Sequence, residues 1–343
     1  MKVLLTGGAG YIGTHTAVEL IAEGHEVVVL DSLANGFAEA VRRVERITGA
    51  AVPLLVGDCA DPAVVDKAFA DHAPDAVVHC AGLKAVGESV GQPLRYYRNN
   101  LDALLALCEV AHDHGVHRMV FSSSATVYGD PATVPITEDM PLSVTNPYGA
   151  TKLFAERILR DLAVADTAWS ITALRYFNPI GAHPSGLIGE APQGVPNNLF
   201  PYIAQVASGH RAKLSVFGDD YDTVDGTGVR DYLHVTDLAR GHVAALDHLA
   251  DSTGFRAYNL GTGRGTSVFE AVRAFEHAAG TAVPCEITGR RPGDIATCYA
   301  DPSAALRGLG WRAEKTVADA CADAWRWQAA NPHGFAGQRD GSE

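Results

Sequence analysis

The stretch Gly7-Gly8-Ala9-Gly10-Tyr11-Ile12-Gly13 decides the fold of this chain. It follows an apolar run at residues 3–5 and precedes apolar residues at helical spacing, which stop at Gly24, a predicted C-terminal cap. In a turn from strand to helix, Gly7 permits the tight bend, Gly10 lets the backbone approach a pyrophosphate, and Gly13 allows close packing. The pyrophosphate would lie at the partly positive N-terminus of the helix. The stretch therefore predicts a dinucleotide-binding turn.

Two acidic residues follow later predicted strands. Asp31 ends the second strand, 18 residues after Gly13. A carboxylate there accepts hydrogen bonds from a ribose hydroxyl and repels a 2′-phosphate, which favours NAD over NADP as the cofactor. Asp58 follows the third strand, where a carboxylate could meet the adenine amino group. An ordinary loop aspartate fits the spacing of Asp58 equally well.

Short apolar runs alternate with helical segments through the first half of the chain. The runs lie at residues 3–5, 27–30, 54–56, 76–78, 119–121 and 171–174, and helical periodicity is clearest at 101–114 and 150–164. Because these runs lack polar alternation, they suit strands buried on both faces. The alternation predicts an α/β fold with a Rossmann-type, doubly wound parallel sheet between two layers of helices.

The pattern changes after residue 177, where Pro, Gly and Asn become frequent. Helices are predicted at 199–208, 236–249 and 316–330, and a capping box at Ser267 opens another that ends near Gly280. We expect the tail after Pro332 to fray. The prediction is an NAD-binding domain of residues 1–177 plus 233–258, and a smaller, discontinuous C-terminal α/β substrate domain of residues 178–232 plus 259–343.

Composition excludes several classes of partner. The 343 residues carry 27 Lys plus Arg against 40 Asp plus Glu, a net charge of −13. Such acidity disfavours nucleic acid and anionic membranes. No apolar run approaches the roughly 18 residues of a membrane span, and the N-terminal run is too short for a signal peptide. The six scattered cysteines form no C-x-x-C pair, so we predict a reducing compartment, the cytoplasm.

Tyr148 and Lys152 are spaced i, i+4, which places both on one face of a helix. A nearby ammonium and a cationic nicotinamide both favour a phenolate, so the pKa of Tyr148 should fall and make it a general base. Ser124 closes the preceding strand, where ligands of such sheets bind, and its hydroxyl could relay a proton. Taken singly, each also fits a surface pair or a polar loop.

Together, the glycine turn, Asp31, Ser124, Tyr148 and Lys152 match the extended branch of the short-chain dehydrogenase/reductase family. Within it, longer motifs resemble the UDP-galactose 4-epimerases, and this resemblance runs from Met1 to about Phe335. The motifs are Ala81-Gly82-Leu83-Lys84-Ala85-Val86-Gly87-Glu88-Ser89, Ser122-Ser123-Ser124-Ala125-Thr126-Val127-Tyr128-Gly129, Leu174-Arg175-Tyr176-Phe177-Asn178-Pro179, Pro196-Asn197-Asn198-Leu199, Gly226-Thr227-Gly228-Val229-Arg230-Asp231-Tyr232 and Arg290-Arg291-Pro292-Gly293-Asp294.

The resemblance implies an isomerase with tightly bound NAD, a UDP-sugar substrate and a transient 4-keto intermediate that turns its other face to the cofactor. Tyr148, assisted by Ser124, would exchange the proton of the sugar's 4-hydroxyl, and Lys152 would hold the nicotinamide ribose. The implied cofactor-binding residues are Gly7, Gly10, Tyr11, Ile12, Gly13, Asp31, Asn35, Asp58, Cys59, Cys80, Ala81, Gly82, Lys84, Asn99, Ser122, Tyr148, Lys152 and Tyr176. The implied substrate-binding residues are Lys84, Ser124, Tyr148, Asn178, Asn198, Leu199, Phe217, Arg230, Tyr232, Arg291, Asp294 and Cys298.

Three positions depart from the resemblance. Ser32 stands where many members carry Asn, and Cys80 where some carry Phe, so both could change how NAD is held. Cys298 stands where some members carry a bulky Tyr. A small residue there implies room for a 2-acetamido group, and hence activity on UDP-N-acetylglucosamine and UDP-N-acetylgalactosamine. Plain packing is the alternative interpretation of Cys298.

Other readings stay open. A UDP-pentose or UDP-uronate could replace the hexose, or the chain could be a catalytically silent NAD-sensing scaffold, although Tyr148 and Lys152 are both present. A 4,6-dehydratase is disfavoured because Ala125-Thr126 stands where that class carries an Asp-Glu pair. Relatives are commonly homodimers, and the apolar faces of residues 101–110 and 153–162 are compatible with one.

No metal site is expected. His112, His114 and His117 crowd the end of a predicted helix, but no carboxylate is aligned with them in the sequence. They read as solvated residues or as partners of the helix dipole. The acidic residues between 220 and 231 are out of register for a calcium loop.

Overall fold

The computed structural model describes residues 1–291 and 293–337. Its centre is one sheet of seven parallel strands in the order β11-β6-β5-β4-β1-β2-β3. These strands are β1 (Lys2–Thr6), β2 (Glu26–Asp31), β3 (Leu54–Val56), β4 (Ala76–His79), β5 (Arg118–Ser124), β6 (Ser170–Tyr176) and β11 (Gly254–Leu260). The strand order reverses between β1 and β4, and such a switch point is where ligands bind at the carboxyl ends of the strands.

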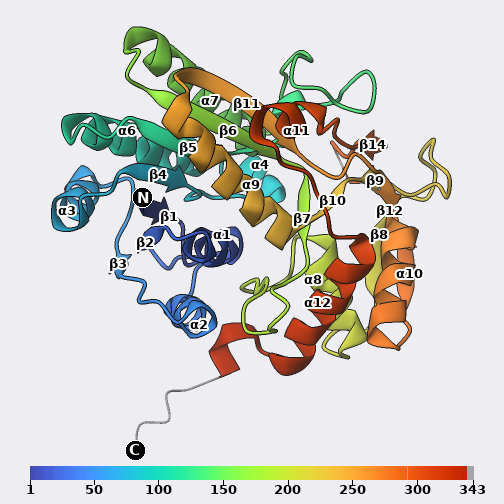
Figure 1. Ribbon diagram of the computed structural model, residues 1–343. Helices are drawn as coiled ribbons and strands as arrows, with labels where there is room; N and C mark the ends of the chain where they lie inside the picture. Colours follow the sequence, from blue (N-terminus) through green and yellow to red (C-terminus); the bar gives the residue numbers. More distant parts are fainter. Residues whose placement is uncertain (292, 338–343) are drawn as a thin grey trace, which may run out of the picture.

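Helices cover both faces of the sheet (Figure 1). One layer holds α2 (Ala38–Thr48), α1 (Tyr11–Ala22) and α9 (Val235–His248), and the other holds α3 (Pro62–His72), α6 (Ala103–Asp113) and α7 (Pro147–Ala165). Alternate residues of β1 enter the two cores: Val3 and Leu5 pack under the first layer, and Leu4 packs under the second. The predicted doubly wound α/β fold is thus confirmed, because the runs that lacked polar alternation form strands between two apolar layers, apart from the partly exposed edge strand β3.

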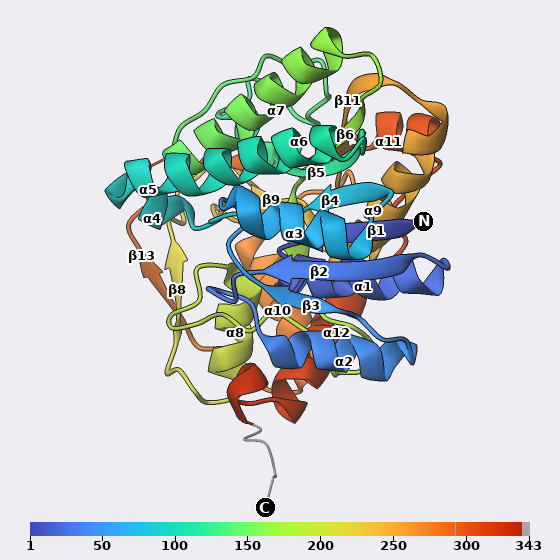
Figure 2. The same cartoon turned by 90° about the vertical axis from the view of Figure 1, so that its left-hand side faces the viewer.

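The expected helix at 101–114 begins differently. The short helices α4 (Val86–Gly91) and α5 (Pro93–Tyr97) lead into a π-helical turn, η1 (Arg98–Asp102), before α6 starts. Figure 2 shows α5 and α6 end to end on this face of the molecule, with α7 running beside them. The π turn is often found at functional sites, and its residue Asn99 lines the cleft described below.

The second half of the chain builds a smaller unit beside the carboxyl edge of the sheet (Figure 1). Its helices α8 (Leu199–Ala207), α10 (Val268–Ala279) and α12 (Val317–Ala330) enclose a core that includes Ile203, Phe275 and Cys321. The capping box at Ser267 and the end at Gly280 are confirmed. The remaining elements are β7 (Asn178–Ile180), β8 (Leu214–Phe217), β9 (Val229–Arg230), β10 (Tyr232–His234), β12 (Thr266–Ser267), β13 (Cys285–Thr288), β14 (Thr297–Cys298), α11 (Ser303–Leu309), and the 3-10 turns η2 (Ala125–Tyr128), η3 (Leu249–Asp251) and η4 (Gly334–Gly337).

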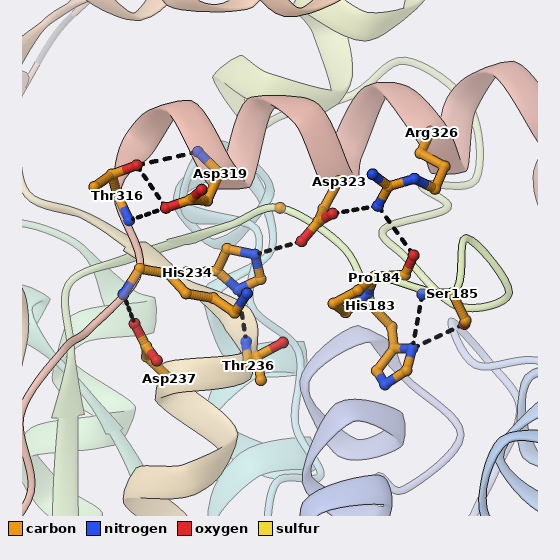
Figure 3. A network of polar contacts seen from close by, with 12 residues as sticks. His183, Pro184, Ser185, His234, Thr236, Asp237, Thr316, Asp319, Asp323 and Arg326 are labelled. Atoms are coloured by element: carbon orange, nitrogen blue, oxygen red, sulfur yellow. Dashed lines mark hydrogen bonds and ion pairs between the residues drawn. The ribbon is translucent and has the colours of Figure 1, made fainter.

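A polar network joins this unit to the sheet layer (Figure 3). The ring nitrogen Nδ1 of His234 accepts from the Thr236 backbone N–H and so caps α9. Because Nδ1 is an acceptor, Nε2 of His234 carries the proton and donates to Asp323 of α12 at 3.2 Å. Arg326 also pairs with Asp323. The first turn of α9 and the middle of α12 are therefore fixed to one another by buried polar contacts.

The expectation that the chain frays after Pro332 is wrong for residues 334–337. They form η4, in which the Phe335 ring lies 4.8 Å from Trp327 and 5.2 Å from Phe37, centroid to centroid. Burial of an aromatic ring supplies enough apolar contact to order a Gly-rich end. Residues 338–343 and Pro292, which belongs to one of the resemblance motifs, lie outside the described residues.

Candidate active site

A cleft of about 550 Å³ opens over the carboxyl ends of the strands, at the switch point. Every predicted cofactor-binding residue lines it except Tyr148, Lys152 and Tyr176. The residues that it brings together are Gly7, Gly10, Tyr11, Ile12, Gly13, Asp31, Asn35, Asp58, Cys59, Cys80, Ala81, Gly82, Lys84, Asn99 and Ser122.

The glycine turn leaves no room for side chains. Gly7 has a φ of 70°, and a Cβ placed on it would lie 2.6 Å from the Ala81 backbone nitrogen. A Cβ on Gly13 would lie 2.3 Å from the Gly7 carbonyl oxygen. Gly10 is the N-cap of α1, and among the described residues no side chain caps this helix end. The uncapped N–H groups of α1 therefore face the cleft side and suit an anionic group such as a pyrophosphate.

Asp31 is held rigidly at the edge of the cleft. Its Oδ2 accepts from the Ala9 N–H at 2.9 Å, and its Oδ1 accepts from the Leu33 N–H at 2.8 Å. Burial raises the pKa of Asp31, and these two hydrogen bonds partly offset the rise. Each carboxylate oxygen keeps a second lone pair for a ribose hydroxyl. With the uncapped helix end, this geometry fits a dinucleotide, and the residues that would hold it are those of the cleft.

The three predicted catalytic residues meet where β5 ends and α7 begins. Asn146 caps α7 by accepting from the Gly149 N–H at 2.8 Å, which places Tyr148 in the first turn. Ser124 ends β5, and its hydroxyl oxygen accepts from the Thr126 N–H at 3.2 Å. Lys152 is buried, and its Nζ donates to the Ser122 carbonyl oxygen at 2.7 Å. The i, i+4 spacing thus acts as predicted, since both side chains face the same strand end.

The predicted fall in the pKa of Tyr148 is wrong for the protein alone. Burial raises the pKa of Tyr148 above its ordinary value, and a hydrogen bond from Ser124 offsets only part of the rise. The Lys152 ammonium was expected to lower it, but burial lowers the pKa of Lys152 itself to about 8. Desolvation therefore outweighs the attraction of the nearby charge.

A buried ion pair that the sequence did not reveal supports this strand end. Arg175 on β6 donates through Nη2 and Nε to Glu156 on α7, at 2.7 and 2.9 Å, and both side chains are 2% exposed. The Ser123 hydroxyl donates to the same carboxylate. The pair fixes α7, and with it Tyr148 and Lys152, against β5 and β6. Neither residue is marked by spacing, because the partners are 19 residues apart.

Most predicted substrate residues gather in the second half of the chain, away from the wall of the 550 Å³ cleft. Arg230 lies 3.9 Å from Asp294, and Cys298 pairs with Arg230 across the β9–β14 ladder. The Arg291 guanidinium lies 3.7 Å from the centroid of the Phe217 ring. In the β7–β10 pair, Asn178 stands opposite Tyr232. Leu199 is the first residue of α8.

Asn198 and Lys84 instead line the cleft, where both contact Glu190. The Asn198 amide donates to Glu190 Oε1 at 2.7 Å, and Lys84 Nζ lies 3.3 Å from the same oxygen. Glu190 connects the predicted cofactor side to the predicted substrate side, and no motif in the sequence marks it. Phe335, from the tail expected to fray, also lines the cleft.

The expectation that no carboxylate is aligned with the histidines is wrong. Asp166, at the end of α7, lies 3.8 Å from His112 Nδ1 and 3.7 Å from His117 Nε2, while His114 lies 2.7 Å from Asp66. His112, His117 and Asp166 are the one group of three in the described ranges whose ligand atoms, all within 4.8 Å, could hold a metal. Only the folded structure brings Asp166 to these histidines, since about fifty residues separate it from them in the sequence. Over the same described ranges, no helix is both long and apolar enough to cross a membrane.

Known proteins resemble this chain over nearly its whole length. The NAD dependent epimerase/dehydratase family matches residues 3–261. A UDP-glucose 4-epimerase of Bacillus subtilis is 60% identical over 335 residues, 98% of this chain and 99% of that protein. The crystal structure of the Bifidobacterium longum UDP-glucose 4-epimerase, in complex with NAD+ and UDP, is 55% identical with a TM-score of 0.95, covering 98% of this chain and 100% of that one.

The enzyme from Stenotrophomonas maltophila, a UDP-glucose 4-epimerase with bound NAD and formylated UDP-arabinopyranose, is 51% identical. Its TM-score is 0.95, and the match covers 97% of this chain and 99% of that chain. Identity and coverage this high show that the chain shares the fold and the family of these proteins. The chain therefore belongs to the NAD dependent epimerase/dehydratase family, among the relatives of the UDP-glucose 4-epimerases.

Proposed function

We propose that this protein catalyses the NAD-dependent, reversible epimerisation of UDP-glucose and UDP-galactose at carbon 4, through a transient 4-keto sugar. The observation that carries this proposal is the meeting of Ser124, Tyr148 and Lys152 at the end of β5, next to Ser122, which lines a cleft that fits a dinucleotide. Family membership and 60% identity to a UDP-glucose 4-epimerase support it.

In this reaction Tyr148 is the general base that takes the proton of the 4-hydroxyl and later returns it. Ser124 hydrogen-bonds the phenol and steadies the developing charge. NAD, held by the residues of the cleft, would supply the hydride acceptor and donor for this reaction. Burial raises the pKa of Tyr148, and a cationic nicotinamide nearby would lower it and favour the phenolate. Lys152, held by the Ser122 carbonyl, is placed to bind the nicotinamide ribose.

The nucleotide end of the substrate would be held by residues 178–232 and 259–337, and the cofactor by residues 1–177 and 233–258. Arg230 and Arg291 carry the positive charge that a diphosphate requires. Phe217 offers a ring to the uracil, and Asp294 accepts from the ribose. Asn178, Asn198, Leu199 and Tyr232 complete this set. Strong binding at UDP leaves the sugar free to turn over while the cofactor stays in place.

The first experiment is to purify the protein, add no NAD, and offer UDP-galactose while resolving the products by chromatography. Formation of UDP-glucose without added cofactor is expected, because the cofactor is regenerated in each cycle. No turnover, even after NAD is supplied, would contradict the assignment. The silent NAD-binding scaffold would then be the better reading.

We also propose that N-acetylated sugars are accepted. Cys298 is half-buried beside Arg230 in the predicted sugar region, and its side chain is small. The variant Cys298→Tyr fills this space, so it should lose turnover of UDP-N-acetylgalactosamine while keeping turnover of UDP-galactose. Absence of N-acetyl activity in a wild-type enzyme that epimerises UDP-galactose would end this proposal.

A second candidate substrate is a UDP-pentose. The Stenotrophomonas maltophila structure carries a formylated UDP-arabinopyranose, which favours this alternative over a UDP-uronate. Competition between UDP-galactose and UDP-arabinopyranose for the enzyme would distinguish them, since the preferred substrate has the higher kcat/KM.

We propose that two copies associate through α6 and α7. These neighbouring helices expose Leu105, Phe154 and Val164, which are 42%, 47% and 77% exposed. Charged substitution Phe154→Glu should yield monomers in sedimentation experiments, whereas Val224→Glu, at a residue exposed on a distant loop, should not. A wild-type monomer would contradict the proposal.

We propose a cytoplasmic location as well, because all six cysteines are free.

A further inference from the structure

His242 is a buried histidine that the proposed reaction does not use. It lies on α9, under strands β5 and β6, and its side chain is inaccessible to solvent. Its Nδ1 lies 3.0 Å from the Leu238 carbonyl oxygen, one helical turn earlier. A carbonyl oxygen only accepts, so Nδ1 carries the proton and Nε2 is an acceptor. Burial lowers the pKa of His242 to about 4, which keeps this neutral form at ordinary pH.

The direction of the next two hydrogen bonds follows from this tautomer. The Tyr176 hydroxyl contacts His242 Nε2 and must donate to it. Since the Tyr176 hydrogen is then committed, its oxygen accepts from the Ser122 hydroxyl, 2.6 Å away. The chain of donors therefore runs from Ser122 through Tyr176 to His242, and from His242 to the Leu238 carbonyl. In this arrangement each of the four groups has a partner.

This chain of hydrogen bonds begins at Ser122, the residue whose carbonyl oxygen binds Lys152. The Ser122 carbonyl oxygen accepts from Lys152 Nζ at 2.7 Å, and the Ser122 side chain lines the cofactor cleft. Tyr176 and Ser122 come from the strand ends that carry the site, while His242 reaches them from the opposite layer to α7. Cys80, whose Sγ lies 4.0 Å from His242 Nε2, packs beside the same group from β4.

We propose that His242 is a positioning residue for the proposed epimerase reaction: through Tyr176 and Ser122 it fixes the end of β5 to which Lys152 is bound. This inference rests on the proposed function. Without the Nε2 acceptor, a buried Tyr176 hydroxyl loses its partner and must turn to Ser122, which reverses that bond. The end of β5 then shifts, and Lys152 loses its close carbonyl acceptor. Small displacements of positioning groups of this kind lower kcat strongly.

Two isosteric variants separate this role from simple packing. In His242→Asn, the amide nitrogen can keep the Leu238 contact, but nothing reaches Tyr176. In His242→Gln, the longer side chain can present its carbonyl oxygen where Nε2 stood. We expect His242→Asn to lower kcat about tenfold or more, with KM for UDP-galactose within about twofold, since the nucleotide contacts are untouched. His242→Gln should restore most of kcat.

A second readout does not depend on turnover. NMR titration of the protein with 13Cε-labelled lysine, without added cofactor, follows Lys152 directly, and Lys152→Arg assigns its signal. We expect the pKa of Lys152 near 8 in the wild type and in His242→Gln. It should fall by roughly half a unit in His242→Asn, because the ammonium loses an acceptor.

The outcomes are distinct. If the two variants lose activity and thermal stability equally, His242 is only a packing residue and the proposal fails. It also fails if kcat and the Lys152 titration are unchanged in His242→Asn. Should His242→Asn not fold, Tyr176→Phe breaks the same chain and is expected to act in the same direction. An inactive wild type would instead contradict the epimerase assignment, and the titration would still test the positioning role.

Discussion

At the residue scale, the type of a side chain and its burial affect its reactivity separately. Tyr148 has the right position to act as a base, yet burial alone raises its pKa. In the proposed reaction its reactivity would therefore depend on a cationic ligand. Without such a ligand, a phenolate at this buried position would have no counter-charge, which is energetically unfavourable.

Removal of the Tyr148 hydroxyl should abolish most catalysis without preventing folding. We expect Tyr148→Phe to lower kcat by roughly 10²- to 10⁴-fold, the usual contribution of a positioned general base. Initial rates with UDP-galactose measure the effect. Tyr202→Phe on α8 is the control, because its ring contacts Arg211 and no predicted catalytic group. Equal rates for wild type and Tyr148→Phe would assign the base to another residue.

Deprotonation of Lys152 should cause the decline of activity at alkaline pH. Its pKa is lowered from 10.5 to about 8 by burial. Because the ammonium is the form that donates to Ser122 and to a ribose hydroxyl, activity should decline as pH rises through about 8. The profile of kcat/KM between pH 6 and 10 tests this. Lys152→Met should lose most activity, and its kcat/KM should no longer decline at alkaline pH. If the alkaline decline persists in that variant, it belongs to the titration of another group.

At the scale of elements, most helices and strands follow local rules. The capping boxes at Ser267 and Thr316 begin α10 and α12, where the sequence predicts helices. The difference at η1, a π turn in place of an α-helix, has no such local mark. The helices α5 and α7 pack against it, so we attribute its backbone conformation to these contacts.

The pair Glu156–Arg175 should contribute more to stability than an exposed pair on the same helix. In Glu156→Gln, the Arg175 guanidinium stays buried without its counter-charge, and we expect a loss of about 3–5 kcal/mol in the free energy of unfolding. Asp161→Asn breaks the exposed Arg157–Asp161 pair and should cost less than about 1 kcal/mol. Urea unfolding measures both. Similar losses in the two variants would show that burial of the pair is unimportant.

At the scale of the whole molecule, four neutral histidines lie in the interior of the described residues: His15, His79, His234 and His242. Burial lowers the pKa of His15 and His79 to about 3 and that of His242 to about 4, against an ordinary value of 6.5. His15 lies on α1 and His242 on α9, while His79 and His234 are the last residues of β4 and β10. Burial disfavours the charged form of each of them in the folded protein.

Acid should therefore destabilise the protein well before its carboxylates are protonated. Below pH 6.5 the unfolded chain binds protons that the folded chain does not, so stability falls as pH decreases from 6.5 towards 4. The slope is about 1.4 kcal/mol per pH unit for each such histidine. Urea midpoints at several pH values test this. His79→Asn should flatten the slope, and His277→Asn on the exposed face of α10 should leave it unchanged; an unaltered slope in His79→Asn would contradict the assignment.

The sequence by itself determined the glycine turn, Asp31, the Tyr148–Lys152 spacing, the order of strands and helices, and the family. These depend on periodicity, on caps and on backbone freedom within a few residues, which are local properties. Only the tertiary structure decided that Glu190 joins Lys84 and Asn198, that Asp166 faces the histidines and that Phe335 orders the tail. It also decided the sign of the pKa shift of Tyr148. Each of these depends on burial or on contacts between distant segments, and desolvation has no signature in the order of residues.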